Sequence, residues 1–209
     1  MADRILSLLL SLPGLLIALS MHEFAHGYAA YIMGDRTAEL DGRLSINPLH
    51  HLDPIGALCL LLFRFGWAKP VPINPYNFRN RKAGIIVVSL AGPLMNFVLA
   101  LIFAFIQFIM INFAPVNDIT QFLYTVVILT IQLNIGLMCF NLIPIPPLDG
   151  SRVLAELLPY RFKRAFYEVE KYSAFILMIA LFTRALNPVL STMYGFVNQI
   201  IYLVVGLIF

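Results

Sequence analysis

The feature that most constrains this chain is the stretch from residue 83 to residue 114, which contains no Asp, Glu, Lys or Arg. About 20 consecutive apolar residues allow a helix to cross the hydrocarbon core of a bilayer. Residues 5–33 and 119–143 form two comparable stretches, and one short polar motif interrupts the first of them. Only 12% of all residues are charged, whereas soluble domains carry about a quarter. The sequence therefore predicts an all-α polytopic membrane protein.

The C-terminal part leaves the number of membrane spans open between four and five. Residues 172–187 and 189–209 are both apolar, and an Asn-Pro pair divides them, so they form two spans or a single broken one. Residues 151–172 are amphipathic and charged, which is typical of a helix that lies at the membrane surface. No polar stretch is long enough for a separate soluble domain, so we interpret residues 1–209 as one integral membrane domain.

The region between the first and second spans is expected to be irregular. Residues 55–66 are apolar but too short to span the membrane, which favours a re-entrant or interfacial segment. Residues 66–75, GWAKPVPINP, contain alternating prolines, which prohibit a helix and favour an extended edge strand. A second short strand is predicted at Arg43–Asn47.

The distribution of basic residues orients the chain in a cell membrane. Lys and Arg are concentrated between the first and second spans and again after the third, and these segments share one side if each span crosses once. The positive-inside rule makes that side cytoplasmic. The N-terminal apolar stretch is interpreted as retained, because no small-residue cleavage pattern follows it.

The first span carries the motif His22-Glu23-Phe24-Ala25-His26. Residues i and i+4 lie on one face of a helix, so both imidazoles can bind a single zinc ion. Glu23 is rotated away from the histidines and can take a proton from a water molecule that the zinc activates. Ionisable side chains at membrane depth are costly and usually mark function, so the motif predicts two metal ligands and a general base.

A third ligand is expected from another segment, because catalytic zinc uses three protein ligands and keeps one position open. Asp149 in NLIPIPPLDG is the best candidate, since three prolines stop the third span before the membrane boundary. Irregular backbone is tolerated there when it lines a water-filled cavity, and hydrolysis needs water. The alternative is that Asp149 and Gly150 form an ordinary turn. The end of the first span and Asp149 both approach the cytoplasmic face, so an active site there faces the cytoplasm.

Other polar residues of the first loop compete for the same role. His50, His51 and Asp53 could also touch a metal site, although adjacent histidines in a loop lack the helical spacing. Asp35 and the acidic residues that follow it are interpreted as part of a solvated loop. The chain has no Lys/Arg-rich run with interleaved aromatic residues in a polar context, so no nucleic-acid partner is expected.

Three stretches together resemble the site-2 protease family of intramembrane zinc metalloproteases: HEFAH, AGPLMN at 91–96 and FNLIPIPPLDG at 140–150. The sequence GWAKPVPINP is also similar to the membrane-associated strand region of that family. The resemblance extends from about residue 15 to residue 160. The chain looks like a minimal member without a PDZ domain or a nucleotide-sensing domain.

The resemblance implies a role for five residues. It implies His22, His26 and Asp149 as zinc ligands and Glu23 as the catalytic base. It also implies that Asn141 donates a hydrogen bond to the substrate or to the developing oxyanion. The implied reaction is hydrolysis of a peptide bond in or near the transmembrane segment of a membrane protein, whose helix must unwind before attack.

The leading hypothesis is therefore an intramembrane zinc endopeptidase with one zinc ion per chain. A second enzymatic hypothesis is a membrane metalloprotease that acts on soluble or lipidated tails. A non-catalytic zinc-binding or zinc-transport protein is the alternative from another class, although transporters usually show repeated halves, and this sequence has no internal repeat. The lipid bilayer and a membrane protein substrate are the expected partners. The substrate, the cleavage position, the regulatory trigger and the oligomeric state stay open.

Overall fold

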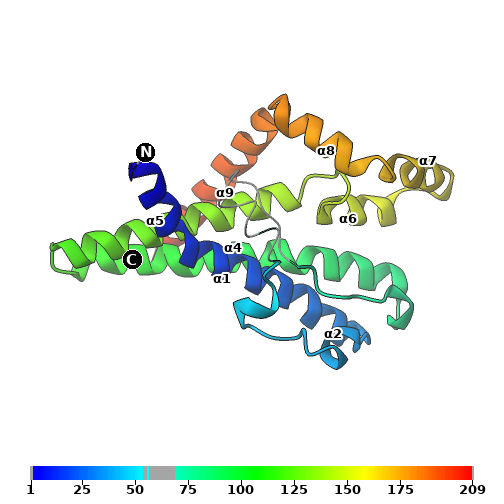
Figure 1. The fold of residues 1–209 in the computed structure, drawn as a ribbon, viewed down its shortest axis with the longest axis horizontal. Helices are drawn as coiled ribbons and strands as arrows, with labels where there is room; N and C mark the ends of the chain where they lie inside the picture. The colour runs from blue at the N-terminus through cyan, green and yellow to red at the C-terminus, as the bar shows by residue number, and fades with distance from the viewer. Residues whose placement is uncertain (1, 54–55, 57–68, 209) are drawn as a thin grey trace.

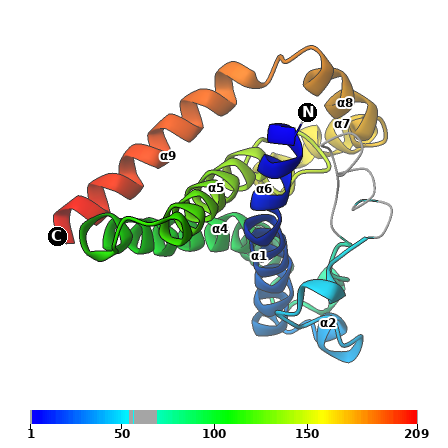
Figure 2. The ribbon, with the colours of Figure 1, turned by 60° about the vertical axis from the view of Figure 1, so that its left-hand side comes forward.

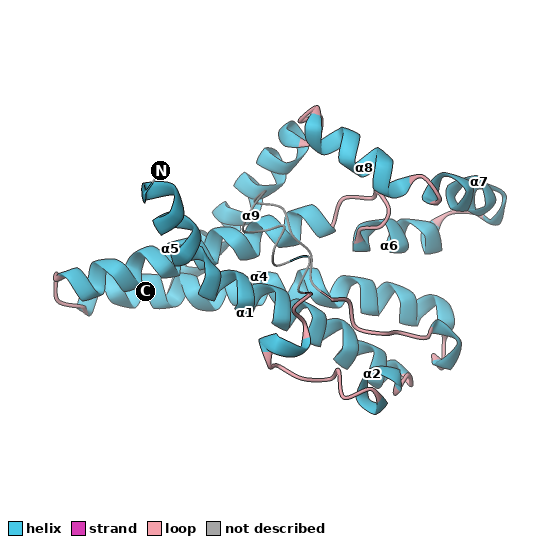
Figure 3. Ribbon diagram, viewed as in Figure 1, coloured by secondary structure: helices cyan, strands magenta, loops and turns pink. Residues whose placement is uncertain are grey.

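The regular structure in the described part of the chain is helical. The computed structural model describes residues 2–53, 56 and 69–208. The helices, in chain order, are α1 (Ala2–Met33), α2 (Thr37–Leu40), the 3-10 helices η1 (Pro48–His50) and η2 (Pro75–Asn77), α4 (Arg81–Phe113), α5 (Asp118–Asn141), α6 (Asp149–Leu157), α7 (Tyr160–Glu170), α8 (Ser173–Phe182) and α9 (Asn187–Ile208). Figure 3 shows no strand among these described residues.

Four helices of the described chain are long and apolar enough to cross a membrane. They are the Leu9–Met33 part of α1 and the whole of α4, α5 and α9. Helix α8 is also apolar, but its 10 residues are too few to cross the hydrocarbon core. The segment 172–209 therefore holds one full-length span, preceded by a shorter apolar helix. The chain is a multi-pass membrane protein. The sequence predicted four or five spans, and the described residues contain four.

Helices α1, α4 and α5 form the central bundle. Helices α4 and α5 run antiparallel side by side, and α1 crosses both of them (Figures 1 and 2). Asn117 makes the tight turn between α4 and α5 possible, because its side chain accepts the Thr120 N–H at 2.9 Å while Thr120 Oγ1 accepts the Asn117 N–H at 3.1 Å. Helix α1 approaches α5 at Gly14, where a Cβ atom would overlap with Thr130.

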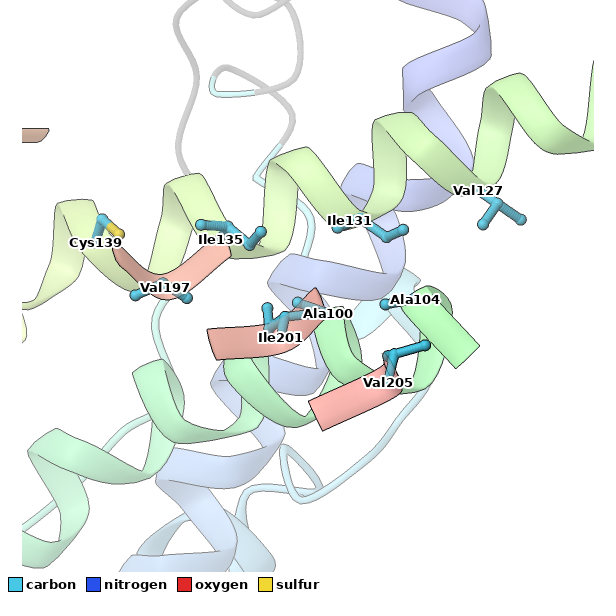
Figure 4. Packing of buried hydrophobic residues seen from close by; sticks show 9 residues of the cluster. All are labelled: Ala100, Ala104, Val127, Ile131, Ile135, Cys139, Val197, Ile201 and Val205. Atoms are coloured by element: carbon cyan, nitrogen blue, oxygen red, sulfur yellow. The ribbon is translucent and has the colours of Figure 1, made fainter. Parts of the chain in front are cut away.

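An apolar cluster joins α9 to the half of the α4–α5 pair that lies next to the turn between these two helices. We call this half the outer half. Figure 2 shows α9 running from α8 toward the turn that connects α4 and α5. Figure 4 shows the buried members of this cluster, which we call the α9 cluster: Ala100, Ala104, Val127, Ile131, Ile135, Cys139, Val197, Ile201 and Val205. The small alanines of α4 let the branched side chains of α9 come close, which is how helices pack in membranes.

The irregular region between α1 and α4 agrees only in part with its prediction. Residues 43–47 are not a strand but a loop, so the strand predicted at Arg43–Asn47 is wrong. Asn47 instead caps the helix η1 by accepting the N–H of Leu49 at 3.1 Å. Residues 69–74 are non-helical, as the prolines predict, but are not assigned as a strand. The predicted re-entrant segment 55–66 lies outside the described residues, apart from Gly56.

Helices α6, α7 and α8 extend beyond the central bundle on one side (Figure 1). Lys163 of α7 donates to Glu156 of α6 at 2.8 Å, which ties these two short helices together. Tyr160, Phe162 and Arg161 of α7 are all exposed. This mixture of exposed aromatic and basic side chains agrees with the predicted amphipathic surface helix.

Candidate metal centre

Three side chains from two distant segments meet inside the bundle. Nε2 of His22 lies 3.0 Å from Nε2 of His26, and these atoms lie 3.2 and 3.3 Å from Oδ2 of Asp149. The histidines are 6% and 7% exposed. Among the described residues this is the one group of three or more His, Cys, Asp or Glu side chains with metal-binding spacing. The structure thus brings together the three residues that the sequence suggested as ligands.

The proline-rich turn after α5 brings Asp149 to the histidines. Helix α5 ends at Asn141, and the prolines that follow keep the chain non-helical until Asp149 begins α6. The carboxylate therefore lies in the first turn of α6, where the helix dipole favours a negative charge. Gly150 is required beside it, because a Cβ atom there would overlap with the carbonyl group of Leu142.

Helix α4 determines which nitrogen of His26 carries the proton. Nδ1 of His26 lies 2.7 Å from the backbone oxygen of Val88. A carbonyl oxygen can only accept a hydrogen bond, so Nδ1 must donate, and Nε2 of His26 presents a lone pair.

A chain of amides determines the same property for His22. Thr130 O accepts from Asn134 Nδ2 at 2.8 Å, and Asn134 Oδ1 accepts from Asn96 Nδ2 at 3.0 Å. Asn96 Nδ2 also donates to the backbone oxygen of Ala18 at 3.1 Å. These bonds orient the Asn96 amide so that its Oδ1 faces Nδ1 of His22 at 2.6 Å. Nδ1 of His22 must therefore donate, and Nε2 of His22 also presents a lone pair.

This arrangement fits a bound cation. Two lone-pair nitrogens and a carboxylate oxygen face one another, and Asp149 Oδ2 is buried without a hydrogen-bond partner among the described residues. Three converging acceptors repel one another unless a positive charge lies between them. Two imidazole nitrogens and one carboxylate oxygen are a ligand set of catalytic zinc sites, and the His–amide and His–carbonyl bonds are the kind of support that orients such ligands.

Gly92 of α4 leaves the room in which the ring nitrogens meet. A Cβ atom at this position would lie 2.6 Å from Cε1 and 2.7 Å from Nε2 of His22, and it would also overlap with Nε2 of His26. Gly92 and Asn96 are four residues apart and both buried, so they share one face of α4. The structure gives each a direct contact with a histidine of the centre.

Glu23 lies beside the centre and faces another segment. Its Oε2 accepts the backbone N–H of Val71 at 2.9 Å, so the carboxylate points to the extended residues 69–74. Asn141 donates Nδ2 to the backbone oxygen of Leu137 at 3.1 Å, within its own helix. The structure thus places Glu23 on the turn between the two histidines and Asn141 at the end of α5.

The loop residues considered as competing ligands lie elsewhere. His51 is buried, and its Nε2 lies 2.6 Å from the backbone oxygen of Ser45. Asp53 accepts the N–H of Gly56 at 2.7 Å, and His50 is exposed. None of the three belongs to the ligand group found in the described residues.

The prediction that Asp35 lies in a solvated loop is wrong. Asp35 is fully buried, at 0% exposure. Asn134 was not singled out at all. Its signal was available, because an amide four residues after Thr130 in an uncharged span makes a polar pair on one helix face.

The sequence is similar to those of known zinc metalloproteases. The sequence profile described as "Peptidase family M50" matches residues 109–184. The protein named "Putative zinc metalloprotease YwhC" from Bacillus subtilis (strain 168) is 40% identical over 179 residues, which cover 83% of this chain and 80% of that protein. "Putative zinc metalloprotease Rip2" from Mycolicibacterium smegmatis is 31% identical over 185 residues, 86% of this chain and 69% of that protein. Rip2 of Mycobacterium tuberculosis (strain H37Rv) is 27% identical over 180 residues, 84% of this chain and 68% of that protein. No solved structure matches the chain.

Proposed function

Because the chain belongs to peptidase family M50, whose members are zinc metalloproteases, we propose that it is an intramembrane zinc endopeptidase. It hydrolyses a peptide bond in or near the transmembrane segment of a membrane protein. The observation that carries this proposal is the meeting of His22, His26 and Asp149 between membrane-spanning helices, where the Nε2 atoms of two neutral imidazoles and a carboxylate oxygen face one another. Zinc, the cofactor of the family, would be held by these three side chains.

Each residue has a separate task in the proposed reaction. When bound, zinc supplies a Lewis acid that activates water and polarises the scissile carbonyl. Glu23 takes the proton of the attacking water and passes it to the leaving amine. The Val71 N–H holds the carboxylate of Glu23 in place at 2.9 Å.

Asn141 is the proposed donor to the oxyanion that develops on the substrate. Its Nδ2 carries two N–H groups, and the bond to Leu137 uses one of them. The second N–H remains for the substrate. A preorganised amide donor of this kind contributes about 2.7–4 kcal/mol in proteases that depend on one.

The substrate enters as an unwound segment, because an α-helix keeps its carbonyl groups in its own hydrogen bonds. The extended residues 69–74 lie directly beside Glu23 and offer an edge along which such a segment pairs. The substrate reaches the protein through the lipid bilayer. No nucleic-acid partner is proposed. The centre faces the cytoplasmic side, as the distribution of Lys and Arg predicts.

The decisive experiment compares metal content with cleavage in purified, reconstituted protein. We expect Glu23→Gln to keep the zinc content of the wild type and to lose cleavage of a transmembrane substrate. His22→Ala, His26→Ala and Asp149→Ala each lose the zinc. Asp41→Asn, a substitution at an exposed acidic residue, is the control and keeps both properties. Cleavage that persists in Glu23→Gln would overturn the assignment of the base.

The same preparation separates the substrate classes. A protease of membrane segments cleaves the reconstituted transmembrane substrate better than the excised soluble peptide of the same sequence. Equal cleavage of both would favour an enzyme that acts on soluble tails. Zinc uptake into vesicles that Glu23→Gln leaves unchanged would favour a zinc carrier.

A further inference from the structure

The segment beside Glu23 has few backbone donors, and two of them bind carboxylates. Residues 69–75 read KPVPINP, and the three prolines carry no N–H. Val71 donates its N–H to Oε2 of Glu23 at 2.9 Å. Asn74 donates its N–H to Oδ2 of Asp35 at 2.6 Å. The segment is thus fixed at one end to α1 and at the other to the residue just beyond α1.

Asp35 holds its end of the segment with a complete set of hydrogen bonds. Its Oδ1 accepts from the N–H of Thr37 at 3.1 Å, from the hydroxyl of Thr37 at 2.5 Å and from Nδ2 of Asn77 at 2.8 Å. Burial raises the pKa of Asp35, but the hydrogen bonds from Thr37, Asn74 and Asn77 lower it by more. The net pKa lies below its usual value, so the buried side chain is a carboxylate. Both oxygens act as acceptors, which an amide cannot reproduce.

The segment also contacts α1 at Gly27, which lies between Glu23 and Asp35 in the sequence. A Cβ atom on Gly27 would lie 3.1 Å from Cγ1 of Val71. Gly27 is one turn after Glu23, so Val71 lies against the helix at the place where Glu23 projects. Beyond the segment, the Arg79 N–H donates to Met33 O at 2.9 Å, which fixes the chain after η2 to the end of α1.

We infer that Asp35 is a positioning residue for Glu23. By fixing Asn74 and Asn77, it places the Val71 N–H against the Glu23 carboxylate and keeps that carboxylate beside the histidine pair. Asp35 itself touches neither the histidines nor Asp149. The catalytic part of this inference rests on the proposed function, whereas its structural part concerns only Asp35, Val71 and Glu23.

The alternating prolines make the structural part measurable without any activity. Since residues 70 and 72 have no amide proton, Val71 is the single exchangeable amide between residues 69 and 73. Hydrogen exchange on the full chain, with and without zinc, therefore isolates the Val71–Glu23 bond. The acceptor of this bond is charged, so loss of the bond speeds exchange at Val71 more than about tenfold.

Three variants give distinct exchange patterns. Glu23→Ala speeds exchange at Val71 and leaves Asn74 protected. Asp35→Asn speeds exchange at both amides, because the anchor and the bond that depends on it are both lost. Asp41→Asn, which changes an exposed carboxylate of the same loop, alters neither. Normal protection of Val71 in Asp35→Asn would overturn the inference.

Kinetics test whether the position of Glu23 matters for turnover. We expect Asp35→Asn to retain zinc and KM and to lower kcat about 10–100-fold, the usual cost of losing the support of an active group. Val71→Pro removes the same N–H directly, and Asp41→Asn is again the control. If Asp35 acts through Val71, adding Asp35→Asn to Val71→Pro changes kcat little further. Independent, multiplying losses would contradict the inference.

The two proposals fail in different ways. If the wild-type chain cleaves no substrate, the proposed function fails, and the exchange pattern still decides whether Asp35 holds Val71 against Glu23. If cleavage is normal and Asp35→Asn changes neither exchange at Val71 nor kcat, only the positioning role fails.

Discussion

The two halves of one row of side chains on α4 serve different purposes. Positions 92, 96, 100 and 104 repeat every four residues and lie on one buried face. Gly92 and Asn96 contact the histidines of the candidate metal centre, and Ala100 and Ala104 pack in the α9 cluster. In a bilayer apolar surfaces gain little from leaving lipid, so close packing and hydrogen bonds hold helices together.

The comparison shows what each half can specify. The members of the α9 cluster are all apolar, so close packing rather than hydrogen bonding holds these side chains together. The half that contains Gly92 and Asn96, which we call the site half, includes a continuous chain of hydrogen bonds. This chain runs from Thr130 O through two amides to His22. Each of its bonds has one orientation, so this half fixes the rotation of α1, α4 and α5 relative to one another.

The largest effect is expected from Gly92→Ala in the site half. The new methyl group would occupy the space between the histidines, so zinc affinity falls by more than the roughly 100-fold seen when only supporting groups are lost. Gly136→Ala on α5 is the matched control, because a Cβ atom there meets nothing within 4 Å. Zinc content after equilibrium dialysis measures the difference. Full zinc occupancy in Gly92→Ala would contradict the geometry of the centre.

Removal of zinc is expected to affect the site half alone. At a zinc concentration of 100 times the Kd, the ion adds about 2.7 kcal/mol of stability. A chelator removes this stabilisation and leaves three acceptors facing one another, so hydrogen exchange accelerates around His22 and His26. Exchange in the Val197–Val205 part of α9 stays unchanged. Equal acceleration in both halves would show that they unfold as one unit.

Asn96→Leu tests the chain of amides at a smaller scale. Without the amide, Nδ1 of His22 loses its acceptor, and zinc affinity falls about 10–100-fold. The control is Gln107→Leu, which removes another buried amide of α4 from the outer half. Competition with a chelating dye gives both affinities. The comparison fails if the two amides turn out to be equally important for zinc.

The smallest effect is expected from Tyr202→Phe in the outer half. The Tyr202 hydroxyl donates to Oε1 of Gln107 at 2.7 Å, which ties α9 to α4. A hydrogen bond between membrane helices is worth about 0.6 kcal/mol on average. We therefore expect a slightly lower thermal stability, with unchanged zinc binding and cleavage. A loss of cleavage would mean that the position of α9 is coupled to the centre.

The sequence predicts this fold and the core of its centre well. Helix periodicity alone places His22 and His26 on one face, and the prolines before Asp149 locate the break that brings it back. The uncharged stretches locate α4 and α5 to within about two residues of their observed ends, the usual margin for helix boundaries.

The remaining features depend on long-range backbone contacts that leave no trace in local sequence. The partner of His26 is the backbone oxygen of Val88, and any residue type could supply it. Asp35 looks solvated in a polar loop, because the donors that bury it, Asn74 and Asn77, come about 40 residues later. The predicted strand at 43–47 is wrong because the N–H groups of Arg43 and Leu44 both donate to Ala38 O and Asn47 caps the helix η1.

The distance along the chain between the histidines and Asp149 has a consequence for biosynthesis. A nascent chain that has inserted only its first two spans carries both histidines but not the carboxylate that closes the centre. The three side chains of the candidate metal centre can therefore meet only after the third span has been made and the ribosome has moved past Asp149.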